Sequence, residues 1–592
     1  MTNVAMLSLW LLLGTSPPPP PIKSAPAAVE IAEAVEAIEA AEAARAPYGY
    51  REASGSADSN TWGPLRVTLH GGALKPQRGY WATQVVLNNS GPQPLPVRLS
   101  FSPAYGDTTR SVVREVEVGP RQRVVAWVPL PVAWHSVVVN ILAPGVVPIN
   151  ESLYADSDRF EPVMVVGSAA DFEAATALTK TGEQDEPYFS ARFLEARDAP
   201  RELAAYVGFE MVVLTDEATA VPADVWAVLE AYAVSGGTLV VTRPSRDLRE
   251  RLPLLPEAMT PEMPYGFGKV WTCDGVALEC QALIRGGVSG VEPTARGPVI
   301  PAGAQQRWVG SMMGERREAL PLLTNARTPV GRFLLVISAF ALAVGPGAWW
   351  LAKRRGPVAV LIAVPAISVV TCLALIFWSV LVDGFAVHTA RYSLTWLDGA
   401  RSRVVTVGLS AWYANLSPDV VRLPSASVLL PPPDDEDALA DLDWTGGLTV
   451  GDGFLPPRTY REWGEVAVLP SRARLVLKRA GETPRIQNAL GARLEEGYLR
   501  LDGKLWRLPV LSEGEEGALT AVAPEDVKDF SVSQGLGEGG ALRLTNALMP
   551  FGANTPENGF IARLSGPGLM PTSGFPTEVD VGVHFIRGEV KP

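Results

Sequence analysis

The sequence predicts a multidomain membrane protein in which α/β and all-β regions flank a hydrophobic helical hairpin. The chain has 592 residues, more than one hydrophobic core usually organises. Two strongly apolar runs, 333–351 and 358–382, follow each other closely. Elsewhere the apolar pattern changes between strand-like alternation and a strand–helix repeat, so different parts of the chain belong to different fold classes.

Composition favours turns and strands, since the chain contains 55 Gly and 52 Pro. Its net charge is −12, and no basic tract is long enough to indicate nucleic acid as a partner. An acidic surface keeps large domains soluble but does not indicate which ligand, if any, the protein binds.

The N-terminal segment, residues 1–27, contains an apolar stretch at Val4–Leu13 of the length found in signal peptides. A small-x-small site at Ala25–Ala27 lies some way downstream. We expect a signal peptide, with an uncleaved N-terminal anchor as the alternative.

Residues 28–60 form an Ala/Glu-rich spacer in the sequence. Glutamates recur every third residue from Glu30 to Glu42, a spacing that moves them around a helix and leaves no wide apolar face. A solvated helix or a disordered linker is the expected state, and a partner-binding helix using Ile31, Val35 and Ile38 is the alternative.

Residues 61–155 alternate β-branched or aromatic residues with polar ones, and Gly-Pro turn signals interrupt them. Such strands at regular spacing predict a small immunoglobulin-like β-sandwich. Residues 160–310 instead alternate buried strands with helices. The helix over 223–234 carries an apolar stripe and ends at Gly236-Gly237. This second region predicts a parallel α/β sheet.

The two apolar runs predict transmembrane helices over 333–351 and 358–382, joined by a short loop at 352–357. Two spans with so short a connection form an antiparallel hairpin, which puts both large flanks on one side. That loop holds three cations, Lys353, Arg354 and Arg355. Positive residues in short loops stay in the cytoplasm, so the bulk of the chain is expected to be extracytoplasmic.

Residues 383–592 return to strand-like alternation and predict one or two further all-β domains. The acidic segment 431–444 lacks the glycine and the ligand spacing of an EF-hand loop, so we expect a solvated turn there and no calcium site.

Two of the three cysteines, Cys273 and Cys280, are close enough in sequence for a turn to join them in a disulfide, which would suit an oxidising compartment. Two unrelated buried thiols are the alternative. Their spacing does not fit a paired zinc site.

No catalytic, metal or cofactor motif is assembled in the sequence. The four histidines, His70, His135, His388 and His584, fall in different segments without ligand spacing. Ser235 follows a helix and precedes a strand, the reverse of the order that a nucleophile elbow requires. The glycine-rich stretch 535–540 does not stand between a strand and a helix, so it does not indicate a phosphate loop.

The segments "FEMVVLTD", "LEAYAVSGGTLVVT" and "MPYGFGKVW" resemble the class I glutamine amidotransferase-like, flavodoxin-type α/β fold of many uncharacterised bacterial membrane proteins. The hairpin "GPGAWWLAKRR" is similar to the membrane segment of the same proteins, and the resemblance covers roughly residues 160–385. Amidotransferases of this fold use a cysteine in a Gly-x-Cys-x-Gly elbow and a downstream histidine. This domain has neither, so the resemblance implies a catalytically empty binding or scaffolding module.

These observations predict a non-enzymatic scaffold or binding protein of the bacterial cell envelope, anchored in the inner membrane. Membrane lipid and envelope proteins are its expected partners, and no cofactor is expected. Ligands of open α/β sheets bind at the carboxyl ends of the strands. There the sequence places Gly167, Ser168, Asp216 and Arg243. The alternatives are an accessory subunit of a membrane transport complex, and a hydrolase whose site is not visible in the sequence.

Overall fold

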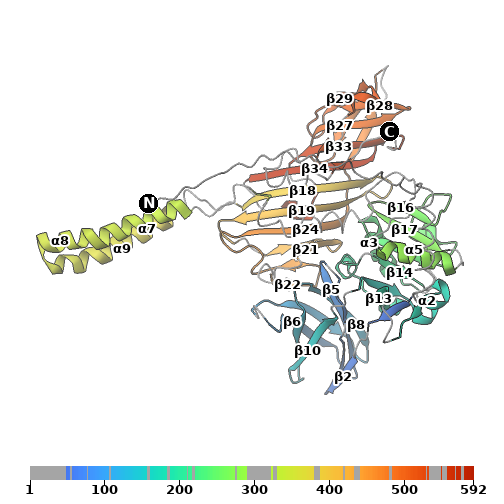
Figure 1. Cartoon of the computed structure of the whole chain (residues 1–592), viewed down its shortest axis with the longest axis horizontal. Helices are drawn as coiled ribbons and strands as arrows, with labels where there is room; N and C mark the ends of the chain where they lie inside the picture. The colour runs from blue at the N-terminus through green and yellow to red at the C-terminus, as the bar shows by residue number, and fades with distance from the viewer. Residues whose placement is uncertain are drawn as a thin grey trace, which may run out of the picture. The chain divides into compact units, whose positions relative to one another are not determined.

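The structure of the chain is a computed structural model (Figure 1). It describes residues 49–591 apart from 54–56, 72, 77, 106–108, 157–159, 183–186, 210, 216–220, 274–276, 290–321, 324–329, 379–386, 418–419, 433–439, 479–482, 528–529, 532–547, 550–555, 567–568 and 575–578. All of these described residues belong to one compact unit, Gly49–Pro592. The expected signal segment, residues 28–48 of the spacer and the glycine-rich stretch 535–540 lie outside them.

The α/β region is built on an eight-stranded, mainly parallel sheet, here called sheet A, in the order β12-β1-β13-β11-β14-β15-β17-β16. Its last strand, β16, is antiparallel to β17. The strands are β1 (Gly49–Glu52), β11 (Pro162–Val166), β12 (Thr179–Lys180), β13 (Phe189–Leu194), β14 (Met211–Leu214), β15 (Thr238–Thr242), β16 (Glu262–Tyr265) and β17 (Gly268–Cys273). Every residue of β11 and β14 is buried, as the continuous apolar runs of parallel strands require.

Helices connect these strands: α2 (Ala169–Thr176), α3 (Ala223–Val234), α4 (Leu248–Arg251) and α5 (Ala277–Ser289), with short 3₁₀ turns η1 (Ala196–Asp198) and η2 (Leu203–Ala205). Helix α3 buries the stripe that its periodicity predicts, including Trp226 and Leu229. It ends before Gly236, whose φ of 129° favours glycine. At Gly237 a side chain would collide with the ring of Tyr232.

A β-sandwich follows β1 and precedes β11, so it is inserted into the α/β region. Its first sheet has the antiparallel order β2-β3-β5-β8, and its second includes β7-β6-β9-β10-β4. The strands are β2 (Ala57–Trp62), β3 (Leu65–His70), β4 (Ala73–Leu74), β5 (Tyr80–Asn89), β6 (Leu95–Pro103), β7 (Val112–Val118), β8 (Arg123–Pro131), β9 (Ser136–Leu142) and β10 (Ile149–Asp156). In β6, buried Val97 and Leu99 alternate with exposed Pro96 and Arg98, which gives one face to the core.

After the hairpin the chain forms a nine-stranded sheet, sheet E, in the order β21-β24-β19-β18-β34-β33-β27-β28-β30 (Figure 1). Its strands are β18 (Val387–Asp398), β19 (Arg403–Ala414), β21 (Ser427–Leu430), β24 (Tyr460–Pro470), β27 (Arg493–Leu501), β28 (Lys504–Leu508), β30 (Thr520–Val522), β33 (Gly559–Ser565) and β34 (Val579–Glu589). Smaller elements are β25 (Arg474–Lys478), β26 (Arg485–Ala489), β29 (Glu516–Ala518), β31 (Phe530–Ser531), β32 (Leu548–Met549), η7 (Pro524–Asp526) and η8 (Pro571–Gly574).

Three short strands of the C-terminal region join the N-terminal sandwich: β20 (Val421–Arg422), β22 (Leu442–Asp443) and β23 (Thr449–Val450). Strand β22 pairs in parallel with β7, with Leu442 opposite Val112. Likewise β1, from the end of the expected spacer, lies between β12 and β13 in sheet A. The sheets therefore extend across the expected boundaries at residues 60 and 383, because short strands pair with segments distant in sequence.

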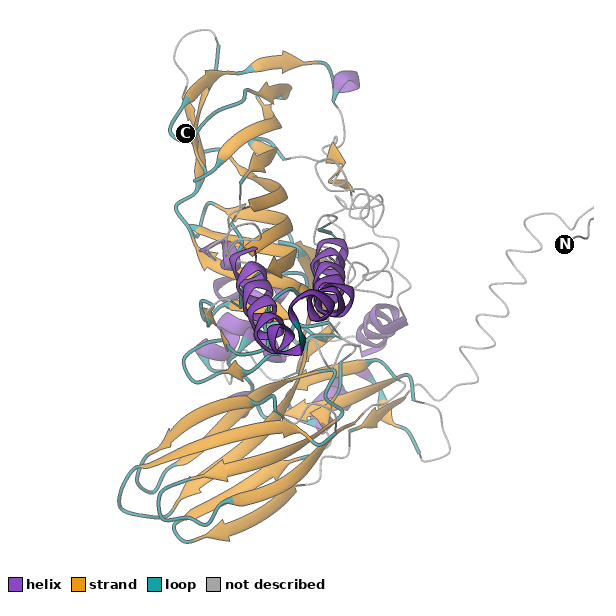
Figure 2. Ribbon diagram, turned by 90° about the vertical axis from the view of Figure 1, so that its left-hand side faces the viewer, coloured by secondary structure: helices purple, strands orange, loops and turns teal. Residues whose placement is uncertain are grey.

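The hairpin consists of α7 (Val330–Leu342), the π-helical turn η4 (Ala343–Gly347), α8 (Ala348–Arg355) and α9 (Pro357–Trp378). Two helical stretches, Leu334–Arg355 and Pro357–Phe377, are long and apolar enough to cross a membrane. Strands dominate the rest of the described chain, and the hairpin helices run side by side (Figure 2). The helix continues through the cations to Arg355, so Gly356 alone makes the turn where the sequence suggested a loop over 352–357. Lys and Arg favour helix, whereas glycine at φ 83° ends it.

Candidate functional site

The sequence predicts a ligand site at the carboxyl ends of the strands of sheet A, which include β11 and β14. This end of the sheet is here called the edge of sheet A. Gly167 follows β11 with φ 138°, a conformation that glycine tolerates. Ser168 then caps α2: its Oγ accepts a hydrogen bond from the Asp171 backbone N–H at 3.1 Å and donates one to Asp171 Oδ2 at 2.7 Å. The hydroxyl of Ser168 is thus engaged in helix capping.

The neighbouring strand ends are also tied together by the chain itself. Thr215 donates its backbone N–H to the carbonyl of Val166 at 3.0 Å, and the hydroxyl of Thr242 donates to the carbonyl of Leu214 at 3.2 Å. Arg243 donates its backbone N–H to the Cys273 carbonyl at 3.2 Å, and its side chain is exposed. The fourth predicted residue, Asp216, lies outside the described residues.

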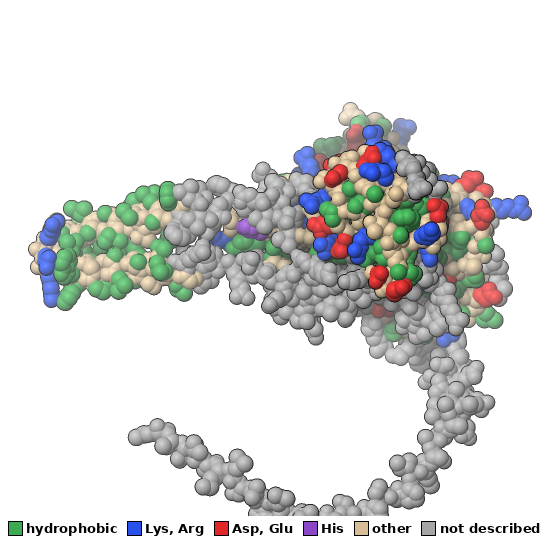
Figure 3. Space-filling model, turned by 90° about the horizontal axis from the view of Figure 1, so that it is seen from above, with side chains coloured by type: hydrophobic (Ala, Val, Ile, Leu, Met, Phe, Trp, Pro, Cys, Tyr) green, Lys and Arg blue, Asp and Glu red, His purple; other side chains and the backbone are tan. Residues whose placement is uncertain are grey.

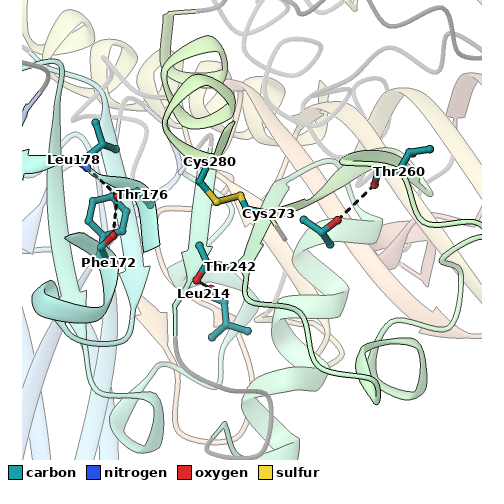
Figure 4. Close-up of a disulfide and its surroundings, with 9 residues drawn as sticks. Phe172, Thr176, Leu178, Leu214, Thr242, Thr260, Cys273 and Cys280 are labelled. Carbon is teal, nitrogen blue, oxygen red and sulfur yellow. Dashed lines mark hydrogen bonds between the residues drawn. A yellow bond between two sulfur atoms is a disulfide. The ribbon is translucent and has the colours of Figure 1, made fainter. Parts of the chain in front are cut away.

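A disulfide joins Cys273, at the end of β17, to Cys280 in α5 (Figure 4). The two Cα atoms are 5.3 Å apart, within the usual span of a disulfide. The bond holds α5 beside the edge of sheet A, near Thr242 and Leu214 (Figure 4). Of the predicted residues, Arg243 donates its backbone N–H to the carbonyl of the bridged Cys273. Gly167 and Ser168 lie between β11 and α2. In the described part of this edge, Arg243 is an exposed cation.

A second polar region, which the sequence did not point to, lies on one face of sheet E. This face carries Arg391 and Ser393 of β18, Ser410 of β19 and Glu465 of β24. Residues directly opposite each other on neighbouring strands lie on the same face: Arg391 is opposite Ser410, and Gly408, two residues before Ser410, is opposite Glu465. His584 of β34 faces Ser393, with its Nδ1 2.7 Å from the serine Oγ. All five side chains are buried.

The segment 569–572 covers this polar face. Its Thr572 donates from Oγ1 to Glu465 Oε1 at 2.6 Å and accepts at its carbonyl from Arg391 Nη2 at 3.1 Å. Ser410 also donates to the same carboxylate. Gly408 leaves room for Met570, whose methyl group occupies the place of a side chain at that position.

The electrostatics of this face follow from its burial. Burial raises the pKa of Glu465, although hydrogen bonds from Ser410 and Thr572 oppose the rise. Burial, with a smaller contribution from the charge of Arg391, lowers the pKa of His584 to about 3. His584 is therefore a neutral imidazole near neutral pH, held by Ser393.

In the described part of this face, the polar atoms buried without a hydrogen-bond partner include Trp412 Nε1, Ser427 Oγ, Trp463 Nε1 and His584 Nε2. Buried polar atoms are usually paired, so their concentration on one face is unusual. Phe454 packs edge-on against both indoles, with ring centroids 5.2 and 5.3 Å away. The face thus retains hydrogen-bonding capacity for water or a small polar molecule, but its Ser–His pair is enclosed and not open to a substrate.

This face gave an ambiguous sequence signal. Polar residues alternate along β18 at Thr389, Arg391, Ser393 and Thr395, the pattern of a strand with one solvated face. All four are buried in the structure. The pattern indicated a polar face correctly, but Thr572 of the covering segment lies 181 residues after Arg391 in the chain, beyond what local periodicity can indicate.

A third polar cluster joins parts of the chain from either side of the hairpin. Glu230 of α3 accepts hydrogen bonds from Arg401 at 3.0 Å and from both terminal nitrogens of Arg403 at 2.7 and 2.6 Å. Tyr265 donates to the same carboxylate at 2.8 Å, and Arg403 Nε donates to Asp398 at 2.8 Å. Only 6% of the Glu230 side chain is exposed, so this is a buried, bidentate pair.

Further contacts link the sandwich to the region after the hairpin. Asp441 Oδ1 accepts a hydrogen bond from the Ser111 backbone N–H at 2.7 Å, and Trp444 Nε1 donates to the carbonyl of Pro129 at 3.1 Å. The hydroxyl of Tyr80 donates to the carbonyl of Leu429. Asp441, from the acidic segment 431–444, therefore has a structural role. In the described part of the chain, no group of three or more His, Cys, Asp or Glu side chains could hold a metal ion.

At the end of the hairpin, Lys353, Arg354 and Arg355 occupy the last turn of α8 with exposed side chains. Space-filling representation shows these cations at the end of the hairpin and apolar side chains along its length (Figure 3). That distribution is the one expected of an apolar span with a basic end.

No protein-family model matches the chain, and no curated protein matches it. Among solved structures, a Paenibacillus cycloisomaltooligosaccharide glucanotransferase is 10% identical with a TM-score of 0.15, over 32% of this chain and 28% of that protein. The yeast delta-COP-I mu-homology domain is 9% identical with a TM-score of 0.17, over 34% and 96%. A Bacteroides uniformis beta-glucuronidase is 7% identical with a TM-score of 0.12, over 31% and 23%. Likenesses this weak carry no argument about function.

Proposed function

We propose that the protein is a membrane-anchored scaffold or binding protein of the bacterial cell envelope, without enzymatic activity. Its hairpin lies in the inner membrane, and the folded unit stands on the extracytoplasmic side. The binding surface is the edge of sheet A formed by the carboxyl ends of β11, β14 and β15.

The observation that carries the proposal is the joining of chain segments across the hairpin. Strand β22, after the hairpin, pairs with β7, before it, and Arg403 binds Glu230. Segments that share a sheet and a buried ion pair must lie on one side of a membrane. An antiparallel hairpin, with Gly356 as its turn, satisfies that requirement.

Two features support the orientation. The cations Lys353, Arg354 and Arg355 occupy the last turn of α8, directly before the connection at Gly356, and basic residues at short connections stay in the cytoplasm. The disulfide between Cys273 and Cys280 belongs to the folded unit, and such bonds persist mainly in oxidising compartments. Both support the proposed position of the folded unit outside the cytoplasm.

The strand order of sheet A supports the amidotransferase-like assignment of the α/β region. Taken in chain order, β13-β11-β14-β15-β17 reads 2-1-3-4-5, the order of flavodoxin-type sheets. In such sheets the ligand crevice lies where the order reverses, here between β11 and β14. The groups at this position, including Gly167 and Ser168, are engaged in holding the edge in shape, which suits recognition of a partner surface.

The test is purification of the full-length protein from membranes in mild detergent, followed by native mass spectrometry and assays with ester, phosphate and glycoside substrates. We expect a complex of defined stoichiometry and no turnover. Arg243→Ala, at the exposed edge of sheet A, should lower the complexed fraction severalfold, whereas Arg472→Ala, an exposed cation of the C-terminal region, should not.

Recovery of the protein alone, with hydrolytic activity, would contradict the proposal. A complex that survives Arg243→Ala and is held through the hairpin instead would favour an accessory subunit of a transport complex.

A further inference from the structure

The end of the hairpin, here called the hairpin tip, consists of Trp349, Trp350, Lys353, Arg354 and Arg355. Its three cations are exposed and lie within one helical turn. The sequence has no Asp or Glu between Glu318 and Asp383, so the tip is a local excess of positive charge in a chain whose net charge is −12.

Two of the cations are held by aromatic rings. Lys353 Nζ lies 3.7 Å from the centroid of the Trp349 ring, and Arg354 Cζ lies 4.1 Å from the centroid of Trp350. The indoles themselves are 64% and 53% exposed. A cation–π contact fixes the position of a cation and leaves its N–H donors available.

These cations have no carboxylate partner in the described part of the chain. The ion pairs of the folded unit involve other arginines and lysines, such as Arg403 with Glu230. An unpaired guanidinium beside a membrane-spanning helix is therefore disposed to bind an external anion. Arginine binds phosphate oxygens through two parallel hydrogen bonds, which lysine cannot do.

We infer that the hairpin tip binds the headgroups of anionic phospholipids in the leaflet that it faces. This inference rests on the proposed membrane anchoring. The tryptophans lie at the headgroup level, as interfacial aromatics do, and position the cations against the phosphates. Each basic residue near an anionic surface contributes modestly, and three together correspond to an enrichment on the order of 100-fold.

The test uses the full-length protein in mild detergent with an equimolar mixture of phosphatidylglycerol and phosphatidylcholine of the same acyl chains, and native mass spectrometry counts the bound lipids. We expect phosphatidylglycerol to exceed phosphatidylcholine by at least about 10-fold, with the ratio falling as salt rises. The triple variant K353Q/R354Q/R355Q should bring the ratio near one. The matched variant R472Q/R474Q/R493Q, which removes three exposed cations of the folded unit, should leave it unchanged.

A wild-type protein that binds both lipids equally, or a triple variant that keeps the preference, would overturn the inference. So would displacement of phosphatidylglycerol by an equal concentration of inorganic phosphate, which would indicate a free-anion site. The double variant R354K/R355K should keep part of the preference, since charge remains and the bidentate contacts are lost.

Failure of the anchoring itself is separately visible. Vesicles of phosphatidylcholine alone should retain the protein after an alkaline wash, because the apolar spans need no anionic lipid. A protein that these vesicles do not retain contradicts the proposed function. One that they retain without any preference for phosphatidylglycerol contradicts only the lipid inference.

Discussion

At the scale of single residues, Glu230 connects the two parts of the chain that the hairpin separates. Its carboxylate accepts hydrogen bonds from Arg401 of the β18–β19 turn, from Arg403 at the start of β19 and from the hydroxyl of Tyr265. A buried carboxylate with this many donors is held in one geometry, and removal of its charge leaves the buried Arg403 with Asp398 as partial compensation. The sequence offered no signal for this pair, because its partners are separated by more than 170 residues.

We predict that Glu230→Gln lowers the free energy of unfolding by about 2 kcal/mol, because Arg403 loses its charge-assisted hydrogen bonds to Glu230 and keeps only the ion pair with Asp398 as partial compensation. Denaturant titration of the full-length protein in detergent measures this. Glu195→Gln is the matched control, since Glu195 and Arg197 form an ion pair with both side chains more than half exposed. The control should cost less than about 1 kcal/mol. Equal losses in the two variants would contradict the role assigned to Glu230.

The buried His584 predicts a specific dependence on pH. Its pKa is about 3 in the folded chain and 6.5 in the unfolded chain, so between these values only the unfolded chain takes up the proton. Stability is therefore lost as pH falls below 6.5. Glu465 acts in the opposite sense, because its raised pKa lets the folded chain bind a proton first.

We predict a loss of about 1.4 kcal/mol from His584 on going from about pH 7.5 to pH 5.5. His584→Asn should remove this part of the loss, and His388→Gln, at a partly exposed histidine, should retain it. Denaturant titrations at the two pH values give the comparison. A loss that is the same in wild type and His584→Asn would show that the imidazole does not stay neutral in the folded chain.

At the scale of elements, the disulfide between Cys273 and Cys280 closes a short loop between β17 and α5. We predict that Cys273→Ser with Cys280→Ser lowers the free energy of unfolding by about 2 kcal/mol, because a short closed loop restricts the unfolded chain. Denaturant titration with and without reductant measures this loss of stability. Cys372→Ser, which replaces the exposed free thiol of α9, is the control.

The redox state of these cysteines also reports the compartment. Denatured protein, isolated without reduction, should take one maleimide tag, at Cys372, and three tags after reduction. Three tags without reduction would show that Cys273 and Cys280 are not bonded in the cell, and one support for the proposed orientation would be lost.

The hairpin turn depends on Gly356, which has φ 83° and ψ 168°, a region open almost only to glycine. No atom lies where a side chain would be added, so the cost of substitution is conformational. We predict that Gly356→Ala destabilises the hairpin by about 1–3 kcal/mol and lowers the fraction of protein that resists alkaline extraction from membranes. Gly345→Ala, also with free space around it, should have little effect. If Gly356→Ala leaves the fraction that resists alkaline extraction at the wild-type value, another residue forms the turn.

Sequence patterns served well for elements that bury one face locally. The stripe of α3 and the alternation of β6 predicted the burial that the structure has. The apolar runs likewise predicted two helices long enough to cross a membrane. Short strands such as β1 and β22 carried no such signal, because their stability comes from pairing with distant strands. Arg243 and Ser168 were placed at strand ends by topology, whereas the covered face of Arg391 and Glu465 depends on a distant segment.

At the scale of the whole molecule, the chain before and after the hairpin shares sheets, hydrogen bonds and a buried ion pair within one compact unit. A membrane span inserted into such a unit must return to the side from which it entered. For the proposed hairpin in the membrane, the packing of the folded unit alone requires both flanks on one side, independently of the count of charges at either end of the apolar helices.

Cysteine accessibility in intact cells tests this claim most directly, in a Cys372→Ser background. Asp58→Cys, before the hairpin, and Glu513→Cys, after it, are both at exposed positions, and Lys353→Cys is in the last turn of α8. A membrane-impermeant maleimide should label positions 58 and 513 equally in intact cells, and position 353 only after permeabilisation. Labelling of positions 58 and 513 from opposite sides, or of 353 together with them, would contradict a single extracytoplasmic unit on a cytoplasm-facing hairpin.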